Sequence, residues 1–404
     1  MTDSPASNAF DSAPIIIAAL AISAIGALFY NILPLYLGSA QDFRQLGNRE
    51  IGFLTSAFFL GYNAVTIWAF FWIRRWNWRT VTWAALPIAL LGLMSGTLTD
   101  NYLLLLFSTA IAGGGFAAIY GIGTTILADT SNPARWYGVK IAAEAFPGAI
   151  LLFVLPMTLI PSQGFPGAAY GLIITALLLS PLLFMLPAHG LKERQAVNEA
   201  QLEEEFADID RRPIWTALIA TFVFFSAASG MWAFIERLGN KLGFEAEAIG
   251  TLLSVTLLFA TGGSLLTAWL GERFGNVKPF YLSCVAMLAA LVLLAMYSDF
   301  NMYAVSTCIL TFGIGVGIPF AVAEIAELDS DGRFIILSVP AIGLGAMVGP
   351  GIAGLLADTG SFMPVLIAAA VAIVVSMLLM RYSDGFRSLA PGVTSTVNNE
   401  HQNS

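Results

Sequence analysis

Glu144 is the clearest ionisable residue inside a long apolar stretch of this sequence. It lies in GVKIAAEAFPG, about two helical turns from the inner end of a predicted membrane segment, 137–160. An ionisable group within a bilayer-spanning helix is costly and therefore marks a candidate functional site. Glu144 could exchange a proton as a cavity opens to either side, or bind a cationic part of a substrate. Lys140, four residues earlier on the same helical face, offers the alternative of a local ion pair.

Two further acidic residues lie near the ends of apolar segments. Glu324, in AVAEIAELDSDGR, is one turn from the end of segment 302–325 and is interpreted as part of an acidic inner rim. Glu236, in MWAFIERLGNK, ends segment 213–236 beside Arg237. Because adjacent residues of a helix do not face each other, we predict a partner for Glu236 across the molecule, as part of an outer gate. Simple exposure at the membrane interface is the alternative.

Polar and amphipathic side chains near the middle of the apolar segments are candidates to line a cavity. They are Tyr30, Asn31, Asn63, Tyr120, Ser229 and Trp232. Helix packing, or an interfacial position for the aromatic residues, is the alternative role for each of them.

The composition predicts the elements that must position these residues. Hydrophobic residues make up 57% and charged residues 11% of the 404 positions, and the mean hydropathy is +0.79. A soluble core could not bury so much apolar surface, so the composition indicates an integral membrane protein. Barrel strands alternate in polarity, whereas IIIAALAISAIGALFYNILPLYL is apolar throughout. The predicted fold class is therefore all-α.

Twelve segments reach the roughly 20 apolar residues that a spanning helix needs. They are 13–37, 50–73, 80–98, 101–127, 137–160, 167–188, 213–236, 247–270, 279–298, 302–325, 334–357 and 362–381.

A long polar run divides the predicted helices into two sets of six. The expected domains are a tail (1–12), a first bundle (13–188), a linker (189–212), a second bundle (213–381) and a disordered tail (382–404). With the N-terminus inside, inner segments hold 14 of the 18 Lys and Arg residues and outer loops hold 4. The positive-inside rule therefore places both tails and the linker in the cytoplasm. The N-terminal stretch lacks the basic region of a cleaved signal peptide.

The two halves match in sequence at an offset of 198 residues. Ile51-Gly52 corresponds to Ile249-Gly250, Arg75 to Arg273, Asp129 to Glu327, and Arg135 to Arg333. The matched arginines lie in two charged turns, WIRRWNWRT and LGERFGNVK. Since six helices return the chain to the same side, the halves are predicted to be parallel repeats.

These features resemble the major facilitator superfamily over almost the whole chain. Its signature after helices 2 and 8 is approximately Gly-x-Leu-Ala-Asp-Arg-x-Gly-Arg. In AWLGERFGN, Leu270 keeps the Leu, Glu272 replaces the Asp, and Arg273 and Gly275 are kept. The first copy departs from the signature, because Arg74 occupies the acidic position and Asn77 that of the second Gly.

The resemblance implies an inner gate built from these charges. It pairs Arg75 with Asp129, Arg273 with Glu327, and Glu272 with Arg135 across the two halves. Arg333 would face the acid of the first turn, where Arg74 stands instead. The alternative is a solvated, positive-inside loop without gating pairs.

The resemblance and the buried groups together predict a secondary active transporter. A small organic solute would bind between halves that alternate in access, driven by a proton gradient across the plasma (inner) membrane. No phosphate-binding Gly-x-x-x-x-Gly-Lys-Ser/Thr loop is present in the sequence, so ATP is not expected to drive transport directly. Within transport, drug/proton efflux is the second choice after transport of a metabolite. The glycine-proline motif of the family's antiporters belongs on the fifth helix, where this chain has only Phe146-Pro147-Gly148. A receptor or scaffold that has kept the fold without transporting is a further alternative.

Other classes of function are disfavoured by composition. The two histidines, His189 and His401, border the linker and lie in the tail, so neither an enzyme nor a metal or cofactor site is expected. Cys284 and Cys308 are interpreted as small buried apolar residues. No basic patch suggests a nucleic acid, and the expected partners are the solute, protons and the bilayer around a monomer. The lack of a strongly basic residue near the midplane favours neutral, zwitterionic, cationic or singly charged solutes.

Overall fold

The computed structural model describes residues 8–191, 211–270, 273–329 and 334–389. Throughout these ranges the chain forms helices and no strand, which confirms the predicted fold class. Twelve of the described helices are long and apolar enough to cross a membrane.

The helices of the first half are α1 (Ala13–Asn31), α2 (Leu33–Arg44), α3 (Asn48–Trp72), α4 (Trp78–Thr97), α5 (Tyr102–Ala128), α6 (Pro133–Val154), α7 (Leu159–Gln163) and α8 (Phe165–Leu179). Those of the second half are α10 (Arg212–Lys241), α11 (Ala246–Leu270), α12 (Val277–Met296), α13 (Phe300–Leu328), α14 (Ser338–Ala357) and α15 (Met363–Leu389). Short 3₁₀ helices are η1 (Ala9–Asp11), η2 (Leu155–Met157), η3 (Ser180–Met185) and η4 (Ile335–Leu337).

The first predicted helix, 13–37, is two helices that meet at Ile32. Ile32 has φ −99° and ψ 11°, outside the α-helical region. Pro34 near the start of α2 explains the break, because proline has no N–H to donate to the carbonyl four residues earlier. That carbonyl belongs to Tyr30, so it lacks the helical donor at residue 34 and can accept from another group.

Several helices continue beyond the apolar stretches that predicted them. α10 reaches Lys241 rather than residue 236, and α15 reaches Leu389 rather than residue 381. Residues 382–389, which we expected in a disordered tail, are therefore helical, and residues 9–11 of the N-terminal tail form η1. Hydropathy alone misses such ends, because a helix satisfies its backbone hydrogen bonds whatever the polarity of its side chains. Most of the predicted linker (192–210) and the last residues (390–404) lie outside the described residues.

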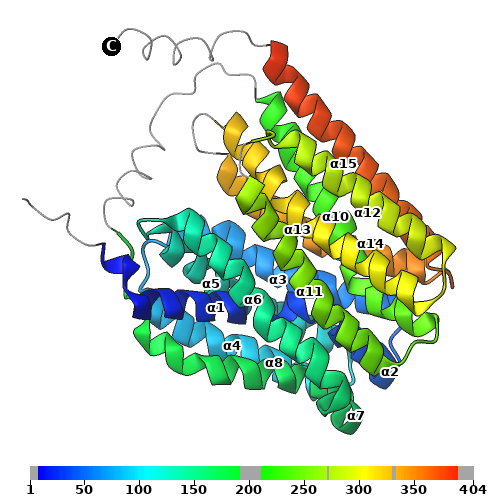
Figure 1. Ribbon diagram of the computed structural model, residues 1–404. Coiled ribbons are helices and arrows are strands. Elements are labelled where there is room, and N and C mark those ends of the chain that lie inside the picture. Colours follow the sequence, from blue (N-terminus) through cyan, green and yellow to red (C-terminus); the bar gives the residue numbers. More distant parts are fainter. Residues whose placement is uncertain (1–7, 192–210, 271–272, 330–333, 390–404) are drawn as a thin grey trace, which may run out of the picture.

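The two halves approach each other at one end and separate toward the other. In Figure 1 the bundles meet near α2 and α7 and diverge toward η1 and the last turns of α15. We call these the closed end and the diverging end. Between the halves, α3 packs on α14, α6 packs on α11, and α2 packs on α10.

Matched glycines allow the backbones of the two halves to approach closely. A Cβ on Gly52 of α3 would lie 2.5 Å from the carbonyl oxygen of Pro350 in α14. A Cβ on Gly250 of α11 would lie 2.7 Å from the carbonyl oxygen of Leu152 in α6. Gly52 and Gly250 are the pair related by 198 residues, so the two sequence repeats meet through equivalent points.

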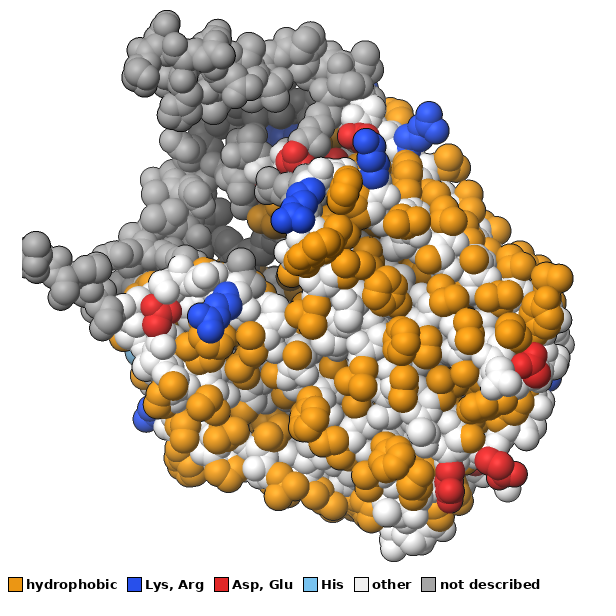
Figure 2. Space-filling model, viewed as in Figure 1, with side chains coloured by type: hydrophobic (Ala, Val, Ile, Leu, Met, Phe, Trp, Pro, Cys, Tyr) orange, Lys and Arg blue, Asp and Glu red, His pale blue; other side chains and the backbone are white. Residues whose placement is uncertain are grey.

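Large apolar side chains cover the outside of the bundles. Leu60, Phe107, Leu178, Leu282 and Leu378 are among the most exposed. Figure 2 shows hydrophobic side chains spread across the middle of the visible face and charged side chains gathered toward the helix ends. This distribution suits a protein surrounded by lipid.

Candidate functional site

Lys140, Glu144 and Tyr120 form a buried polar cluster in the first half. Both charged residues lie on one face of α6, and Nζ of Lys140 is 2.6 Å from Oε1 of Glu144. The same Nζ donates a hydrogen bond of 2.8 Å to the hydroxyl of Tyr120 on α5 and lies 4.0 Å from the centre of the Tyr120 ring. The ion pair considered from the sequence is therefore formed. It holds a partly buried carboxylate and a buried ammonium beside an aromatic ring.

Asn31 fixes α1 against the backbone of this cluster. Its Nδ2 donates a hydrogen bond of 2.7 Å to the carbonyl oxygen of Glu144. Gly148, one turn further along α6, permits the approach, since a Cβ there would lie 2.5 Å from Cβ of Asn31. In this conformation Asn31 positions Glu144 through its backbone rather than facing a cavity with a free amide.

A chain of aromatic rings connects the cluster to the second half. Tyr120 is 6.2 Å from Tyr62, Tyr62 is 5.7 Å from Phe59, and Phe59 is 6.0 Å from Tyr30, all between ring centres. Tyr30 then stacks on Phe225 of α10 at 5.9 Å. These rings form a continuous aromatic surface from Lys140 to α10.

Trp232 joins the halves through the carbonyl that Pro34 leaves free. Its Nε1 on α10 donates a hydrogen bond of 2.8 Å to the carbonyl oxygen of Tyr30 on α1. The indole is buried, at 4% exposure. Trp232 therefore binds the first half near the aromatic rings.

Asn63 and Ser229 both contact α14. Ser229 donates a hydrogen bond of 3.0 Å to the carbonyl oxygen of Gly345. The Asn63 carboxamide lies directly against Gly343 and has no hydrogen-bond partner among the described residues. Both side chains pack between helices in this conformation.

Asp129, at the diverging end, pairs with Arg74 and not with Arg75. Nη1 of Arg74 lies 2.6 Å from Oδ2 of Asp129, and that oxygen also accepts a hydrogen bond of 3.2 Å from the N–H of Leu191. Arg75 is exposed. The expected Arg75 pairing was one residue out, because both arginines follow the end of α3 and successive residues of a turn point in different directions. The N-terminal segment reaches the same loop, since Nδ2 of Asn8 donates to the carbonyl oxygen of Asp129 at 2.8 Å.

The second charged turn makes different contacts from those expected. Glu327 accepts a hydrogen bond of 2.7 Å from Nδ2 of Asn276, while the guanidinium of Arg273 lies 5.3 Å from the ring centre of Trp269. An ion pair between Arg273 and Glu327 is not among those formed within the described ranges. Gly275 has φ of 68°, a left-handed conformation that favours glycine.

The remaining gate candidates are placed only in part. Glu272 and Arg333 lie outside the described residues. Arg135 is exposed, with its guanidinium 5.1 Å from the ring centre of Trp136. Glu324 is buried, at 1% exposure, rather than on a solvated rim, because its side of α13 faces the bundle interior.

Glu236 does pair with its neighbour Arg237, contrary to the sequence argument. Arg237 donates to both Glu236 oxygens, with Nη2 2.6 Å from Oε1. The arginine also bonds Asp42 of α2, with Nη1 2.6 Å from Oδ1 and Nη2 3.0 Å from Oδ2. The long Arg237 side chain folds back along α10, so its guanidinium reaches the adjacent carboxylate. The rule that adjacent helical residues do not face each other takes no account of this reach. The cross-molecule partner therefore belongs to Arg237, and the Glu236 carboxylate packs on Gly38 of α2.

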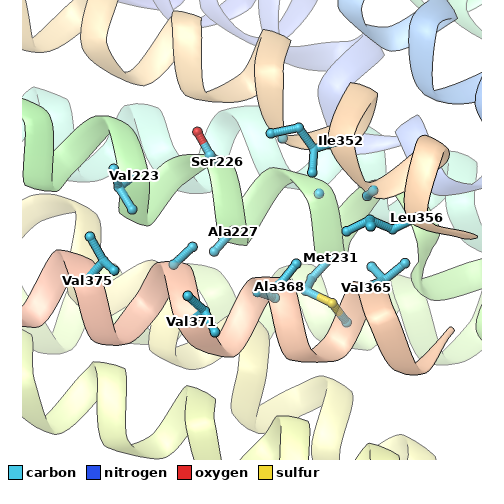
Figure 3. Close-up of a pocket in the computed structure, with 15 residues that line it drawn as sticks. Val223, Ser226, Ala227, Met231, Ile352, Leu356, Val365, Ala368, Val371 and Val375 are labelled. Atoms are coloured by element: carbon cyan, nitrogen blue, oxygen red, sulfur yellow. The ribbon is translucent and has the colours of Figure 1, made fainter.

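An apolar groove on the membrane-facing side of the second half is a different kind of feature. It has a volume of about 300 Å³ and lies between α10, α14 and α15. Figure 3 shows Val371 and Val375 of α15 facing Val223 and Ala227 of α10 across it. Its lining has Ser226 as its polar side chain and no charge, so it offers little to a polar solute. Among the described residues no group of His, Cys, Asp and Glu is arranged to hold a metal ion.

Comparison with known proteins identifies the family. The sequence model of the Major Facilitator Superfamily matches residues 15–331. The chain belongs to the Major Facilitator Superfamily. With its twelve spanning helices, it is a multi-pass membrane protein.

Two curated relatives in this superfamily match part of the chain. The gentisate transporter of Corynebacterium glutamicum is 28% identical over 272 residues, which are 62% of this chain and 59% of that protein. The uncharacterized MFS-type transporter YttB of Bacillus subtilis is 27% identical over 188 residues, 46% of each chain. The matched region thus spans about three fifths of the first relative and less than half of the second. Both relatives are named as transporters rather than enzymes.

Solved structures of the superfamily share the fold. The nucleoside transporter NupG has a TM-score of 0.70 at 13% identity, covering 92% of this chain and 99% of that one. FucP in its outward conformation has a TM-score of 0.62 at 16% identity, covering 93% and 99%. These likenesses support the architecture of the superfamily.

Sequence reasoning missed three residues that this superfamily member uses in its polar contacts. Arg74 was interpreted only as a residue that departs from the family signature, although it forms the ion pair with Asp129. Asp42 and Arg237 were not identified as a pair, although they join α2 to α10. The sequence did hold a signal for the Asp42–Arg237 pair. An acid and a base near the ends of two apolar segments can meet when both ends lie on the same side of the membrane.

Proposed function

We propose that this protein is a secondary active transporter that carries a small organic solute by alternating access. The observation that carries the proposal is the arrangement of two matched halves, in contact at the closed end and apart at the other, with polar and aromatic side chains between them. Membership of a transporter superfamily supports it. We also propose that a monomer is the working unit, since one chain supplies both halves between which the solute would bind.

We further propose that the closed end is the outer face of the plasma (inner) membrane. Most Lys and Arg residues of the short loops lie toward the diverging end, and such residues are retained in the cytoplasm. Both termini and the linker then lie in the cytoplasm. The described conformation would be open toward the cytoplasm, with the outer contacts made.

The relative that transports gentisate, an aromatic carboxylate, supports an organic acid as the first class of solute to test. The aromatic surface formed by Tyr120, Tyr62, Phe59 and Tyr30 supports a ring in that solute, since offset-stacked and edge-to-face contacts between aromatic rings are favourable. Failure to transport any member of a broad panel of acids, sugars, amino acids and cations would favour the non-transporting alternative.

We propose that Glu144 carries the proton that couples transport to the gradient. Its side chain is 15% exposed, so it is partly buried and still accessible to a proton. Glu144→Gln is expected to keep the fold and solute exchange between equal proton concentrations, but to abolish accumulation driven by a pH gradient. Uptake by purified protein in liposomes measures both activities.

Glu247→Gln is the matched control, because Glu247 is an exposed carboxylate in the first turn of α11. It should leave accumulation unchanged. Undiminished accumulation by the Glu144→Gln protein would remove Glu144 from the coupling mechanism while leaving transport itself intact.

A further inference from the structure

We propose that Lys140 is the binding residue for a carboxylate on the substrate, and that Glu144 takes up one proton each time one monoanion binds. The inference rests on the proposed transport function. It adds the charge of the substrate, the residue that recognises this charge, and the stoichiometry of coupling.

The geometry gives Lys140 the capacity to change partners. Its ammonium has three N–H donors, and two oxygens lie within reach, from Glu144 at 2.6 Å and from Tyr120 at 2.8 Å. The Lys140 side chain is 7% exposed and that of Glu144 is 15% exposed. A buried ammonium needs an anionic partner, and Glu144 supplies it when no substrate is bound.

Charge balance links the proton to the substrate. With Lys140 positive and Glu144 negative, the buried pair is neutral. When the Glu144 carboxylate takes a proton from a hydronium ion, which becomes water, it is a neutral acid and Lys140 is left without a counter-ion. A substrate carboxylate then restores neutrality, so one proton and one monoanion enter together. The opposite steps release both, and the O–H bonds of the carboxyl group and of the hydronium ion are the ones made and broken.

The neighbouring groups leave Glu144 as the group that changes charge. On α6 itself Tyr137 bonds the carbonyl oxygen of Thr124, α5 presents Tyr120, and α3 presents Tyr62 behind it. Phenols of this kind ordinarily titrate near pH 10. α1 contributes the neutral Asn31 and Tyr30, and α8 carries Tyr170. α11, which packs on the other side of α6, has its ionisable residue Glu247 at the far, closed end.

The aromatic rings define the rest of the substrate. Tyr120 lies beneath the ammonium, and Tyr62 is the next ring along the aromatic surface. A carboxylate placed on Lys140 therefore brings an attached aromatic ring alongside these two tyrosines. The predicted substrate class is small aromatic monocarboxylates, with a neutral amide of the same shape as a poor substrate.

The first test separates the two driving forces. Purified protein in liposomes is given labelled 2,5-dihydroxybenzoate or benzoate, with protein-free liposomes as background. An inward pH gradient should drive accumulation, whereas a potassium diffusion potential set with valinomycin should add nothing, because the proton and the monoanion cancel in charge. Uptake that follows the membrane potential would overturn the inference and leave transport in place.

The second test measures binding to variants. Lys140→Met should weaken binding of the monocarboxylate about 10- to 100-fold, the usual value of a charged hydrogen bond, while Lys140→Arg should retain most of it. Wild-type affinity should fall up to about tenfold per pH unit as Glu144 ionises, and Glu144→Gln should remove that dependence. Lys278→Met, at an exposed lysine, is the matched control and should bind as the wild type does.

Two outcomes would overturn the inference without touching the proposed function. They are equal binding of the acid by the Lys140→Met protein, and wild-type transport of neutral or cationic solutes with no aromatic acid accepted. Absence of transport for every solute tested would instead contradict the proposed function itself. If Lys140→Met fails to fold, the pH dependence in Glu144→Gln and the driving-force test still decide the matter.

Discussion

Arg237 connects the two halves at the closed end through the carboxylate of Asp42. It is 6% exposed and bonds Glu236 on its own helix and Asp42 on α2. Replacing Arg237 would leave the buried Glu236 carboxylate without its cation, which is strongly destabilising, so Arg237 itself is a poor residue to substitute. The Asp42 side chain is 47% exposed, so water can take the place of its carboxylate beside Arg237 when Asp42 is replaced. Loss of Asp42 therefore weakens the contact between halves while Glu236 continues to neutralise the arginine.

Asp42→Asn is expected to shift the population toward a conformation that opens at the closed end. A loss of about 1 kcal/mol, the upper range for partly exposed ion pairs, would change the ratio of the two conformations about fivefold. A cysteine at Tyr30, in a background without Cys284 and Cys308, should then react faster with a membrane-impermeant thiol reagent added outside.

Asp100→Asn provides the comparison, because Asp100 pairs with Arg44 at the same end but within the first half. It should leave the labelling rate at Tyr30 unchanged. Equal acceleration by both variants would show that charge at this face matters generally and that the Asp42–Arg237 pair is not a latch.

At the scale of the elements, the number and class of the helices were predictable, because a spanning helix must be apolar over a set length. Their breaks and ends were less so. The division at Ile32 depends on Pro34, and the extension of α10 to Lys241 carries polar residues that hydropathy scores as loop.

Partners of charged residues were the least predictable feature of the candidate site. The sequence placed Lys140 and Glu144 on one face, and the structure pairs them. The resemblance paired Arg75 with Asp129, whereas the structure pairs Arg74, since turns do not follow helical periodicity. It also excluded the Glu236–Arg237 pair by a spacing rule that takes no account of the reach of a folded arginine side chain.

The contact of α3 with α14 gives a test at this scale. A Cβ on Gly354 would lie 2.6 Å from the carbonyl oxygen of Asn48 and 3.1 Å from Cα of Gly52. Gly354→Ala should therefore push the helices apart and destabilise the protein by about 1–3 kcal/mol, the usual cost of overpacking. Thermal unfolding in detergent measures the change. Gly262→Ala, at a helical glycine whose Cβ would meet nothing within 4 Å, should not destabilise the protein, and equal losses in both variants would contradict the packing argument.

At the scale of the whole molecule, the repeat in the sequence becomes a repeat in the interface. α3 packs on α14 as α11 packs on α6. Gly52 lies at the first of these contacts, and its match Gly250 lies at the second. Two equivalent interfaces on either side of the aromatic surface allow one half to rock against the other about the centre. Opening toward the outside would require the contacts at the closed end to separate while the halves themselves stay intact.

Tying the halves together at the closed end should therefore stop transport. Nδ2 of Asn48 donates to the carbonyl oxygen of Ala357 at 3.1 Å, so cysteines at these two positions lie within reach of a short, reducible thiol cross-linker. In a background lacking Cys284 and Cys308, cross-linking Asn48→Cys to Ala357→Cys should abolish solute uptake, and a reductant should restore it.

The same reagent applied to Arg44→Cys with Asp100→Cys is the control, because it links two points at the closed end within one half. That cross-link should leave transport close to its starting rate, since each half moves as a unit. Full uptake with Asn48 and Ala357 linked would mean that the solute crosses without separation of the outer contacts, which is incompatible with alternating access between these two halves.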